Sequence, residues 1–370
     1  MLNALINATI FSGEAKLEGK SVLIENGVIQ AVVDTAAVPA EANTIDLSGQ
    51  NIAPGLIDLQ IYGSGGKLFG GTPTEEALAQ MESDLFQQGC TGFLATVATN
   101  SPEIVEQAIA AAKAFRKQSK GNFLGLHLEG PYLNAKRKGA HPEKFIKKAT
   151  TAELKGWIAA AEGEIRIMTV APELQDQEVL DYLHAENVII SAGHSNATYE
   201  EGVSFFGDKV TAATHLFNAM PPLHHREPGL VAAIFGRQPF ASIIADGIHV
   251  SYPMIEIAKR QLGEKLFLIT DAVTATNEGI YPHILNGDRY VMPDGTLSGS
   301  SLSMWQAVKN CVSFAGIGLE EAIRMASSYP AAVINRQHEL GYVRPGYKAN
   351  LIIFDQELNL KQTLMEGLTS

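Results

Sequence analysis

Cysteine is scarce in this chain, where Cys90 and Cys311 are the two among 370 residues. Two cysteines are too few for a disulfide framework or for a metal site built from thiolates. Free cysteine is one of the most frequently buried residue types, so we expect both side chains to lie in the core. The low cysteine content therefore points away from disulfide-linked proteins and thiolate metal centres.

Positive charge and long apolar runs are also scarce. The chain has 28 lysines and arginines against 40 acidic residues, a net charge of −12, which disfavours binding to nucleic acid or to an anionic membrane. No window approaches the roughly 18 consecutive apolar residues of a membrane-spanning helix. The start, MLNALINATIFSGEAK, lacks the basic and apolar regions of a signal peptide. We therefore expect a cytoplasmic protein with neither a nucleic-acid nor a membrane partner.

Short apolar runs that end in polar residues recur along the middle of the chain. Each is typical of a buried parallel strand, and amphipathic helical segments lie between them at the spacing of roughly 30 residues found in strand-helix units. The eight runs are residues 51–61, 91–99, 122–130, 164–172, 187–195, 209–217, 241–249 and 266–273. They predict an α/β fold, a closed (β/α)8 barrel. An open doubly wound sheet is the alternative, disfavoured by the lack of a glycine-rich phosphate loop after the first run.

Capping signals predict where the helices between the runs begin. Thr72 with Glu75, and Thr198 with Glu201, have the spacing of a capping box. In this motif a hydroxyl and a carboxylate satisfy free backbone amides at the first turn of a helix. We therefore expect helices to start directly after Thr72 and Thr198.

The two ends of the chain differ from the middle, with alternating residues and frequent turns. The N-terminal part contains the strong hairpin signal Asn26-Gly27, and the C-terminal stretch LGYVRPGYKANLIIFD has the same strand-and-turn character. We predict that residues 1–51 and 338–370 form one small β-sandwich domain, with the barrel of residues 52–337 inserted between its halves.

Polar and ionisable side chains lie at the ends of six of the eight predicted strands. The carboxyl ends of barrel strands meet at one mouth, whatever their separation in sequence. A single buried histidine is usually structural, but this many charges are difficult to attribute to packing, because burying each one unpaired costs several kcal/mol. The side chains are Asp58, Gln60, His127, Glu129, His194, His215, Asp246, His249 and Asp271.

This set of side chains suits metal-dependent hydrolysis. Two neutral imidazoles, such as His194 and His215, together with a carboxylate can hold Zn²⁺ or a similar ion and leave one position open. Asp271 could then accept a proton from water and return it to a leaving group. The residues alone therefore predict a metal-dependent hydrolase in a barrel.

Seven short blocks add a family resemblance. GLHLEGPYLN, SAGHSNATY, THLFNAM, REPGL, ADGIHV, ITDAV and TLSGSSL occur in this order. They resemble the signature blocks of the N-acetylglucosamine-6-phosphate deacetylase family, within the amidohydrolase superfamily. The resemblance runs from PGLIDLQ to GYKANLIIFD and covers nearly the whole chain. It implies a TIM-like barrel with a terminal β-sandwich, and hydrolysis of the acetamide of N-acetyl-D-glucosamine 6-phosphate in amino-sugar catabolism.

The resemblance also implies roles for individual residues. Glu129, His194 and His215 match the metal ligands, Asp271 matches the catalytic carboxylate, and His141 matches a histidine that polarises the acetamide carbonyl. The positions that match substrate-binding residues are Ala140, His141, Asn218, Ala219, Arg226, His249, Ser301 and Leu302. In the family the arginine reaches in from a neighbouring subunit, which implies a homodimer or a dimer of dimers.

One stretch departs from the wider superfamily. Many amidohydrolases carry His-x-His on the first strand for a second metal, whereas this chain has Gln60-Ile61-Tyr62. Glutamine is a poor zinc ligand, so we expect one divalent ion, Zn²⁺ first, with Fe²⁺, Co²⁺ and Mn²⁺ also suited to the ligands. His127 is expected to support the site without binding the metal.

Two other functions stay open from the sequence. The chain could hydrolyse another N-acetylated sugar phosphate or a small cyclic amide, or it could be a catalytically inactive barrel that binds a sugar phosphate. The three ligand positions together with Asp271 favour an active enzyme over the inactive barrel.

Overall fold

Eight parallel strands form the central sheet of the computed structural model, which describes residues 1–276 and 278–367. The strands pair in the order in which they follow one another along the chain, as a series of strand-helix units requires. They are β8 (Leu56–Ile61), β11 (Cys90–Ala98), β12 (Phe123–Glu129), β13 (Ile165–Val170), β14 (Ile189–Ala192), β15 (Val210–Ala213), β16 (Phe240–Ile244) and β17 (Leu266–Ile269).

The sheet closes on itself just beyond the end of β17. Ile61 pairs with Ala272 in parallel, the Asp271 amide donates to Gln60 O (2.9 Å), and the Tyr62 amide donates to Ala272 O (2.9 Å). The predicted (β/α)8 barrel is therefore confirmed, and the open doubly wound sheet is wrong.

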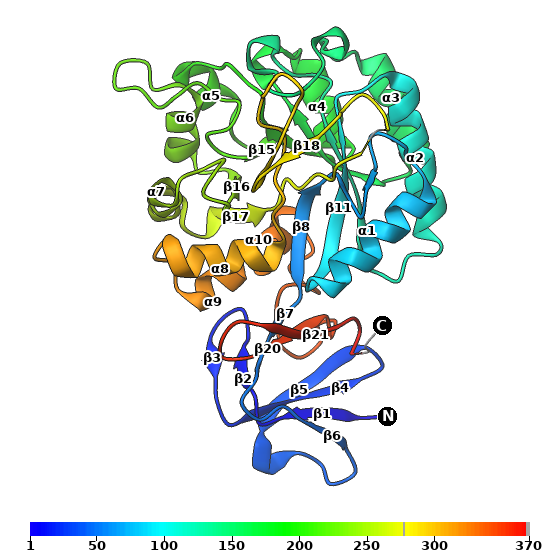
Figure 1. The fold of residues 1–370 in the computed structure, drawn as a ribbon, viewed down its shortest axis with the longest axis vertical. Coiled ribbons are helices and arrows are strands. Elements are labelled where there is room, and N and C mark those ends of the chain that lie inside the picture. The colour runs from blue at the N-terminus through cyan, green and yellow to red at the C-terminus, as the bar shows by residue number, and fades with distance from the viewer. Residues whose placement is uncertain (277, 368–370) are drawn as a thin grey trace.

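Helices surround the barrel on its outer side (Figure 1). They are α1 (Glu75–Gln87), α2 (Pro102–Arg116), α3 (Thr151–Ala161), α4 (Gln177–Ala185), α5 (Tyr199–Phe205), α6 (Gly229–Arg237), α7 (Tyr252–Leu262), α8 (Met304–Phe314), α9 (Leu319–Met325) and α10 (Ser328–Val333). None of the helices in the described ranges combines the length and apolar character that a membrane crossing needs.

The two predicted capping boxes have different outcomes. Thr198 caps α5, its hydroxyl accepting from the Glu201 amide while the Glu201 carboxylate accepts from the Thr198 amide. The prediction at Thr72 is wrong, because α1 begins later and Thr74 is its cap. The Thr72 amide instead donates to Leu68 O (3.1 Å), which binds this residue into the preceding turn.

Two further sheets lie beside the barrel and contain both ends of the chain (Figure 1). One has the order β5-β4-β1-β6 and the other the order β21-β20-β7-β2-β3. The strands are β1 (Asn3–Ile6), β2 (Thr9–Phe11), β3 (Lys16–Leu17), β4 (Lys20–Glu25), β5 (Val28–Asp34), β6 (Asn43–Asp46), β7 (Asn51–Pro54), β20 (Leu351–Phe354) and β21 (Leu360–Leu364). The sheets share one hydrophobic core, which includes Leu5, Val22, Ile52 and Ile353. Asn26-Gly27 links β4 to β5, as predicted.

The first predicted strand run divides between the two units. Residues 51–54 form β7, which pairs with β20, while residues 56–61 form the first barrel strand. Gly55 separates them at a point where a Cβ atom would lie 2.1 Å from Thr91 Oγ1. The exact domain boundaries stay a prediction, and residues 368–370 of the predicted terminal domain lie outside the described residues.

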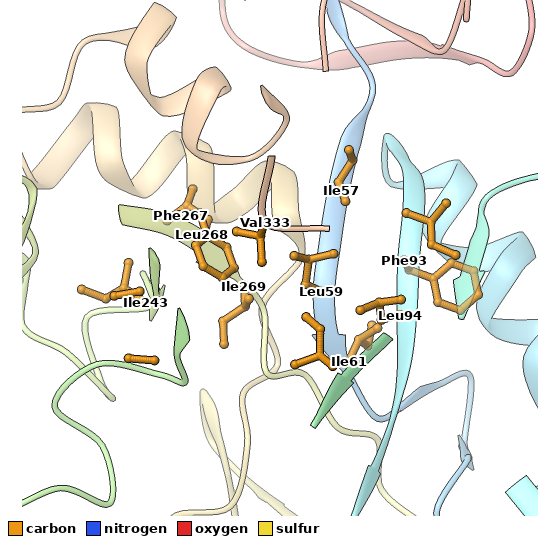
Figure 2. Packing of buried hydrophobic residues seen from close by; sticks show 14 of the residues in the cluster. Ile57, Leu59, Ile61, Phe93, Leu94, Ile243, Phe267, Leu268, Ile269 and Val333 are labelled. Carbon is orange, nitrogen blue, oxygen red and sulfur yellow. The ribbon is translucent and has the colours of Figure 1, made fainter. Parts of the chain in front are cut away.

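Apolar side chains fill the space between the barrel strands and the helices. Figure 2 shows Ile57, Leu59 and Ile61 on β8, with Phe267 and Ile269 on the neighbouring strand β17. All five are at most 3% exposed, and full burial of such a side chain contributes about 1.5–3 kcal/mol. Side chains alternate between the two faces of a strand. Asp58 and Gln60, which lie between these three β8 residues, therefore point away from the helices and into the barrel.

Two small hairpins lie near the barrel mouth. They are formed by β9 (Gly63–Ser64) with β10 (Lys67–Leu68), and by β18 (Ile284–Asn286) with β19 (Arg289–Val291). The second belongs to the long connection between β17 and α8.

Candidate active site

The predicted metal ligands and the predicted catalytic carboxylate lie where barrel strands end. Glu129 is the last residue of β12, whereas His194, His215 and Asp271 each lie two residues beyond a strand. These three have positive φ angles of 45°, 35° and 53°, a left-handed conformation that costs about 1–2 kcal/mol for a non-glycine residue. The left-handed turn bends the chain sharply at the point where these side chains enter the mouth.

Glu129, His194 and His215 converge to within hydrogen-bond distance. His215 Nε2 lies 3.0 Å from Glu129 Oε1 and 3.1 Å from His194 Nε2, and His194 Nε2 lies 3.4 Å from Glu129 Oε1. Ligand atoms at tetrahedral Zn²⁺ bond lengths are separated by about 3.3 Å. The three atoms therefore have the spacing of ligands around one small cation.

The tautomer of His194 supports the same reading. Its Nδ1–H donates to Arg137 O (2.8 Å), which leaves the Nε2 lone pair facing Glu129 and His215. The buried Nδ1 of His215 has no hydrogen-bond partner among the described residues. Imidazole nitrogens that share a buried space with a carboxylate suit a divalent metal ion, whose charge would balance the cluster.

His141 approaches the other side of the same carboxylate. Its Nε2 lies 3.1 Å from Glu129 Oε2, and its ring centroid is 4.3 Å from that of His194. The Glu129 carboxylate, His141 and His194 also form a group with metal-ligand spacing. Burial alone would raise the pKa of Glu129, but His141 and the two other imidazoles hold this pKa well below its ordinary value.

Asp271 lies beside this cluster, tied to the first barrel strand. Gln60 Nε2 lies 2.8 Å from Asp271 Oδ1, 3.0 Å from Glu129 Oε1 and 2.8 Å from the Tyr62 hydroxyl. Burial first, and the negative charge of Glu129, raise the pKa of Asp271 to about 8 against the opposing effect of His215. The pKa of the Asp271 carboxyl group therefore lies near neutral pH in the absence of a bound cation.

Tyr62 joins both carboxylates, a contact that the sequence analysis missed. Its hydroxyl donates to Glu129 Oε2 and lies 3.3 Å from Asp271 Oδ1. Burial, with the charges of Asp271 and Glu129, raises the pKa of Tyr62 well above its ordinary value, so the phenol is neutral. The period of two along β8 was a usable signal, because it places Tyr62 on the same face as Gln60.

A buried polar layer lies beneath the cluster. His127 Nδ1 contacts Leu59 O (2.9 Å), and its Nε2 contacts Thr169 Oγ1 (2.7 Å). Thr169 Oγ1 lies 2.7 Å from Thr214 Oγ1, which in turn lies 2.6 Å from Ser191 Oγ. Burial lowers the pKa of His127 to about 4. His127 is thus neutral and bridges strands, one layer away from the ligand atoms.

One cavity connects the cluster to five of the eight predicted substrate-binding residues. Its volume is about 180 Å³. His249, whose Nδ1 contacts Asp246 Oδ2 at 2.6 Å, belongs to its wall. The predicted residues that line the cavity are Glu129, Ala140, His141, His194, His215, Asn218, Ala219, His249 and Asp271.

Three predicted substrate residues lie elsewhere. Ser301 and Leu302 line a neighbouring pocket instead, because the Ser301 hydroxyl donates to Asp288 O (3.0 Å) and the Leu302 amide to Ser300 Oγ (3.0 Å). Arg226 lies in an exposed loop and is not among the residues that line the cavity.

The connection after β17 contributes cavity residues that the sequence did not indicate. Tyr281 and His283 stack at 5.9 Å between ring centroids, with an angle of 9° between the rings. His283 Nδ1 lies 3.0 Å from Ser298 Oγ, and all three residues line the cavity. Their segment is irregular, so no strand or helix period marks these side chains in the sequence.

The amidohydrolase family model matches residues 51–370, and the model of the NagA composite domain matches residues 2–52. A Haemophilus influenzae protein named N-acetylglucosamine-6-phosphate deacetylase is 36% identical, with 99% of each chain covered. This chain belongs to the N-acetylglucosamine-6-phosphate deacetylase family of amidohydrolases.

Solved structures agree with this membership. The N-acetylglucosamine-6-phosphate deacetylase from Pasteurella multocida has a TM-score of 0.95 and 32% identity, with 100% of both chains covered. A mutant deacetylase from Mycobacterium smegmatis, in complex with N-acetyl-D-glucosamine-6-phosphate, has a TM-score of 0.92 and 28% identity, covering 100% of this chain and 99% of that one. The deacetylase family fold therefore extends over the whole chain.

Proposed function

We propose that this protein hydrolyses the acetamide of N-acetyl-D-glucosamine 6-phosphate to D-glucosamine 6-phosphate and acetate, a step of amino-sugar catabolism. One observation carries the proposal: the Glu129, His194 and His215 ligand atoms meet in the same cavity as the Asp271 carboxyl group. The Haemophilus relative that bears this activity in its name matches 99% of this chain, which supports the choice of substrate.

Glu129, His194 and His215 would hold one divalent metal ion, with Zn²⁺ the first choice for two imidazoles and a carboxylate. When bound, the ion supplies Lewis-acid polarisation of the amide carbonyl, lowers the pKa of water, and favours the ionised form of Asp271. Fe²⁺, Co²⁺ and Mn²⁺ suit the same donors.

Asp271 and His141 would move and hold the protons of the reaction. Asp271 accepts a proton from the attacking water as its oxygen bonds to the acetamide carbon. His141 donates a hydrogen bond to the carbonyl oxygen as negative charge develops there. Asp271 then delivers its proton to the amide nitrogen, the C–N bond breaks, and acetate leaves the amino sugar.

The sugar phosphate would occupy the rest of the cavity. Ala140, Asn218, Ala219 and His249 line it and are proposed to contact the substrate. Arg226 is exposed in its own chain, so we propose that it binds phosphate in the cavity of a partner subunit, because a guanidinium matches phosphate geometry. This role of Arg226 implies a homodimer or a dimer of dimers, and we place the enzyme in the cytoplasm because its start lacks the regions of a signal peptide.

The decisive experiment measures acetate release by the zinc-loaded protein and by Asp271→Asn. We expect the substitution to lower kcat by about 10²–10⁴-fold, the usual contribution of general acid–base catalysis, while the bound zinc stays constant. Full activity of Asp271→Asn would remove this carboxylate from its role.

A substrate comparison tests the specificity. N-acetylglucosamine without phosphate is expected to lose most of kcat/KM, because the phosphate contacts are absent. Faster turnover of N-acetylgalactosamine 6-phosphate would instead identify another member of the same substrate class. Zinc binding without any turnover would favour an inactive sugar-phosphate-binding barrel.

A further inference from the structure

Tyr62 directly follows the first barrel strand, and its hydroxyl contacts both buried carboxylates of the site, Glu129 and Asp271. We propose that Tyr62 is a positioning residue, whose hydroxyl fixes the outer oxygen of Glu129 and thereby keeps the inner oxygen directed at the cation. The inference rests on the proposed function only in assuming that Glu129 is a metal ligand. Tyr62 is 8% exposed, and its hydroxyl lies within the same buried cluster as Asp271.

The direction of the hydrogen bond between Tyr62 and Glu129 follows from the chemistry of the carboxylate. A carboxylate can only accept, so the single hydrogen of the phenol points at Glu129 Oε2, its nearer carboxylate partner. The Gln60 NH₂ group has two hydrogens for three acceptors: the Tyr62 oxygen (2.8 Å), Glu129 Oε1 (3.0 Å) and Asp271 Oδ1 (2.8 Å). Tyr62 therefore donates to Glu129, and its oxygen faces the Gln60 amide.

This arrangement assigns different tasks to the two oxygens of Glu129. Oε2 accepts from Tyr62 and faces His141. Oε1 faces the Nε2 atoms of His194 and His215 and also lies 3.0 Å from Gln60 Nε2. A hydrogen bond to the outer oxygen fixes the rotation of the carboxylate about its own axis. Groups that orient a metal ligand in this way typically change metal affinity or activity by about 10–100-fold when they are removed.

The test compares Tyr62→Phe with Tyr132→Phe. Tyr132 is also buried, and its hydroxyl donates to a carboxylate, Glu153 Oε2 (2.9 Å), outside the cavity. Zinc release to an excess of a coloured chelator is followed with each protein, so that this readout needs no substrate. We expect Tyr62→Phe to release zinc about tenfold faster than wild type, and Tyr132→Phe to release it at the wild-type rate.

Kinetics separate positioning from loss of structure. Tyr62→Phe is expected to lower kcat about tenfold while KM stays unchanged, because the metal ligand rather than the sugar contact is disturbed. Wild-type zinc release by Tyr62→Phe would overturn the proposal. If wild type releases no acetate and Tyr62→Phe still loses zinc faster, the proposed function fails and the role of Tyr62 stands.

Discussion

At the scale of single residues, Asp58 shows how the barrel accommodates a buried charge below its active site. Asp58 is 0% exposed. Its Oδ1 accepts from the amides of Gln60 and Thr270 (both 3.2 Å), and its Oδ2 accepts from the Thr270 hydroxyl. These bonds tie β8 to the residue after β17. Burial nevertheless raises the pKa of Asp58 from 3.8 to about 6, because the hydrogen bonds offset only part of the lost hydration.

Asp58 should therefore make stability depend on pH. A carboxyl group whose folded-state pKa lies above its unfolded value binds its proton more tightly in the folded state, so stability falls as pH rises from about 4 to 6 and is constant above. In metal-free protein, we expect the free energy of unfolding of wild type, relative to Asp58→Asn, to fall by about 1 kcal/mol between pH 5 and pH 7.5.

Urea denaturation of both proteins across this pH range checks the prediction. Other titrating groups are common to the two proteins and cancel in the difference. A difference that rises with pH, or that does not change, would show that Asp58 is ionised in the folded protein well below pH 6.

At the scale of elements, the ends of the strands are fitted too closely to tolerate added atoms. Gly193 lies between the end of β14 and His194, where a Cβ atom would lie 2.7 Å from Thr169 Cγ2 and 2.8 Å from Thr214 Cβ. Both threonines belong to the buried polar layer beneath the site. A side chain at Gly193 would therefore push apart strands that position the proposed metal ligands.

Replacing Gly193 with alanine tests this fit. We expect Gly193→Ala to cost about 1–3 kcal/mol of unfolding free energy and to weaken zinc binding, because His194 follows directly. Gly156→Ala is the matched control: a Cβ atom there meets nothing within 4 Å in the middle of α3, so it should gain about 0.4–1 kcal/mol. Equal effects of the two substitutions in urea denaturation would contradict the packing argument.

The sequence predicts the barrel strands well, because a strand buried on both faces must be a continuous apolar run. It fails at residues 51–61, where an equally apolar stretch passes from one sheet to another and only Pro54-Gly55 marks the change. It also misplaces the start of α1, because Thr72 has the composition of a cap but bonds to the preceding turn.

The sequence predicts the site residues at strand ends but not those in irregular segments. Polar residues at strand ends, such as His215, could be brought together by the geometry of a barrel alone. Tyr62 could not be recognised so easily, since a tyrosine after an apolar strand has the appearance of a core residue. His283 and Ser301 lie in irregular segments, where the path of the chain decides which of them faces the cavity.

At the scale of the whole molecule, the metal is expected to hold the fold together as well as to act in catalysis. Glu129, His194 and His215 come from three different strand ends, so an ion bound to all of them links separate parts of the barrel. An ion that binds only the folded state stabilises it by about 2.7 kcal/mol when its free concentration is a hundred times Kd.

Metal removal should therefore lower thermal stability. We expect an excess of chelator to lower the unfolding temperature of wild type, measured by circular dichroism, and readdition of zinc to restore it. His194→Ala, which lacks one ligand, should show little response to either treatment. An unchanged unfolding temperature of wild type after complete removal of zinc would contradict a structural contribution from the ion.

The closure of the barrel has a consequence for how the enzyme comes into being. Asp271 is tied through its backbone to Gln60, more than two hundred positions earlier in the chain. During synthesis, the ligand-bearing strands emerge from the ribosome before the residue that exchanges protons. If Asp271 has its proposed role, we expect a nascent or truncated polypeptide that ends before this joint to be unable to cleave an amide, because the last strand has not yet docked against the first.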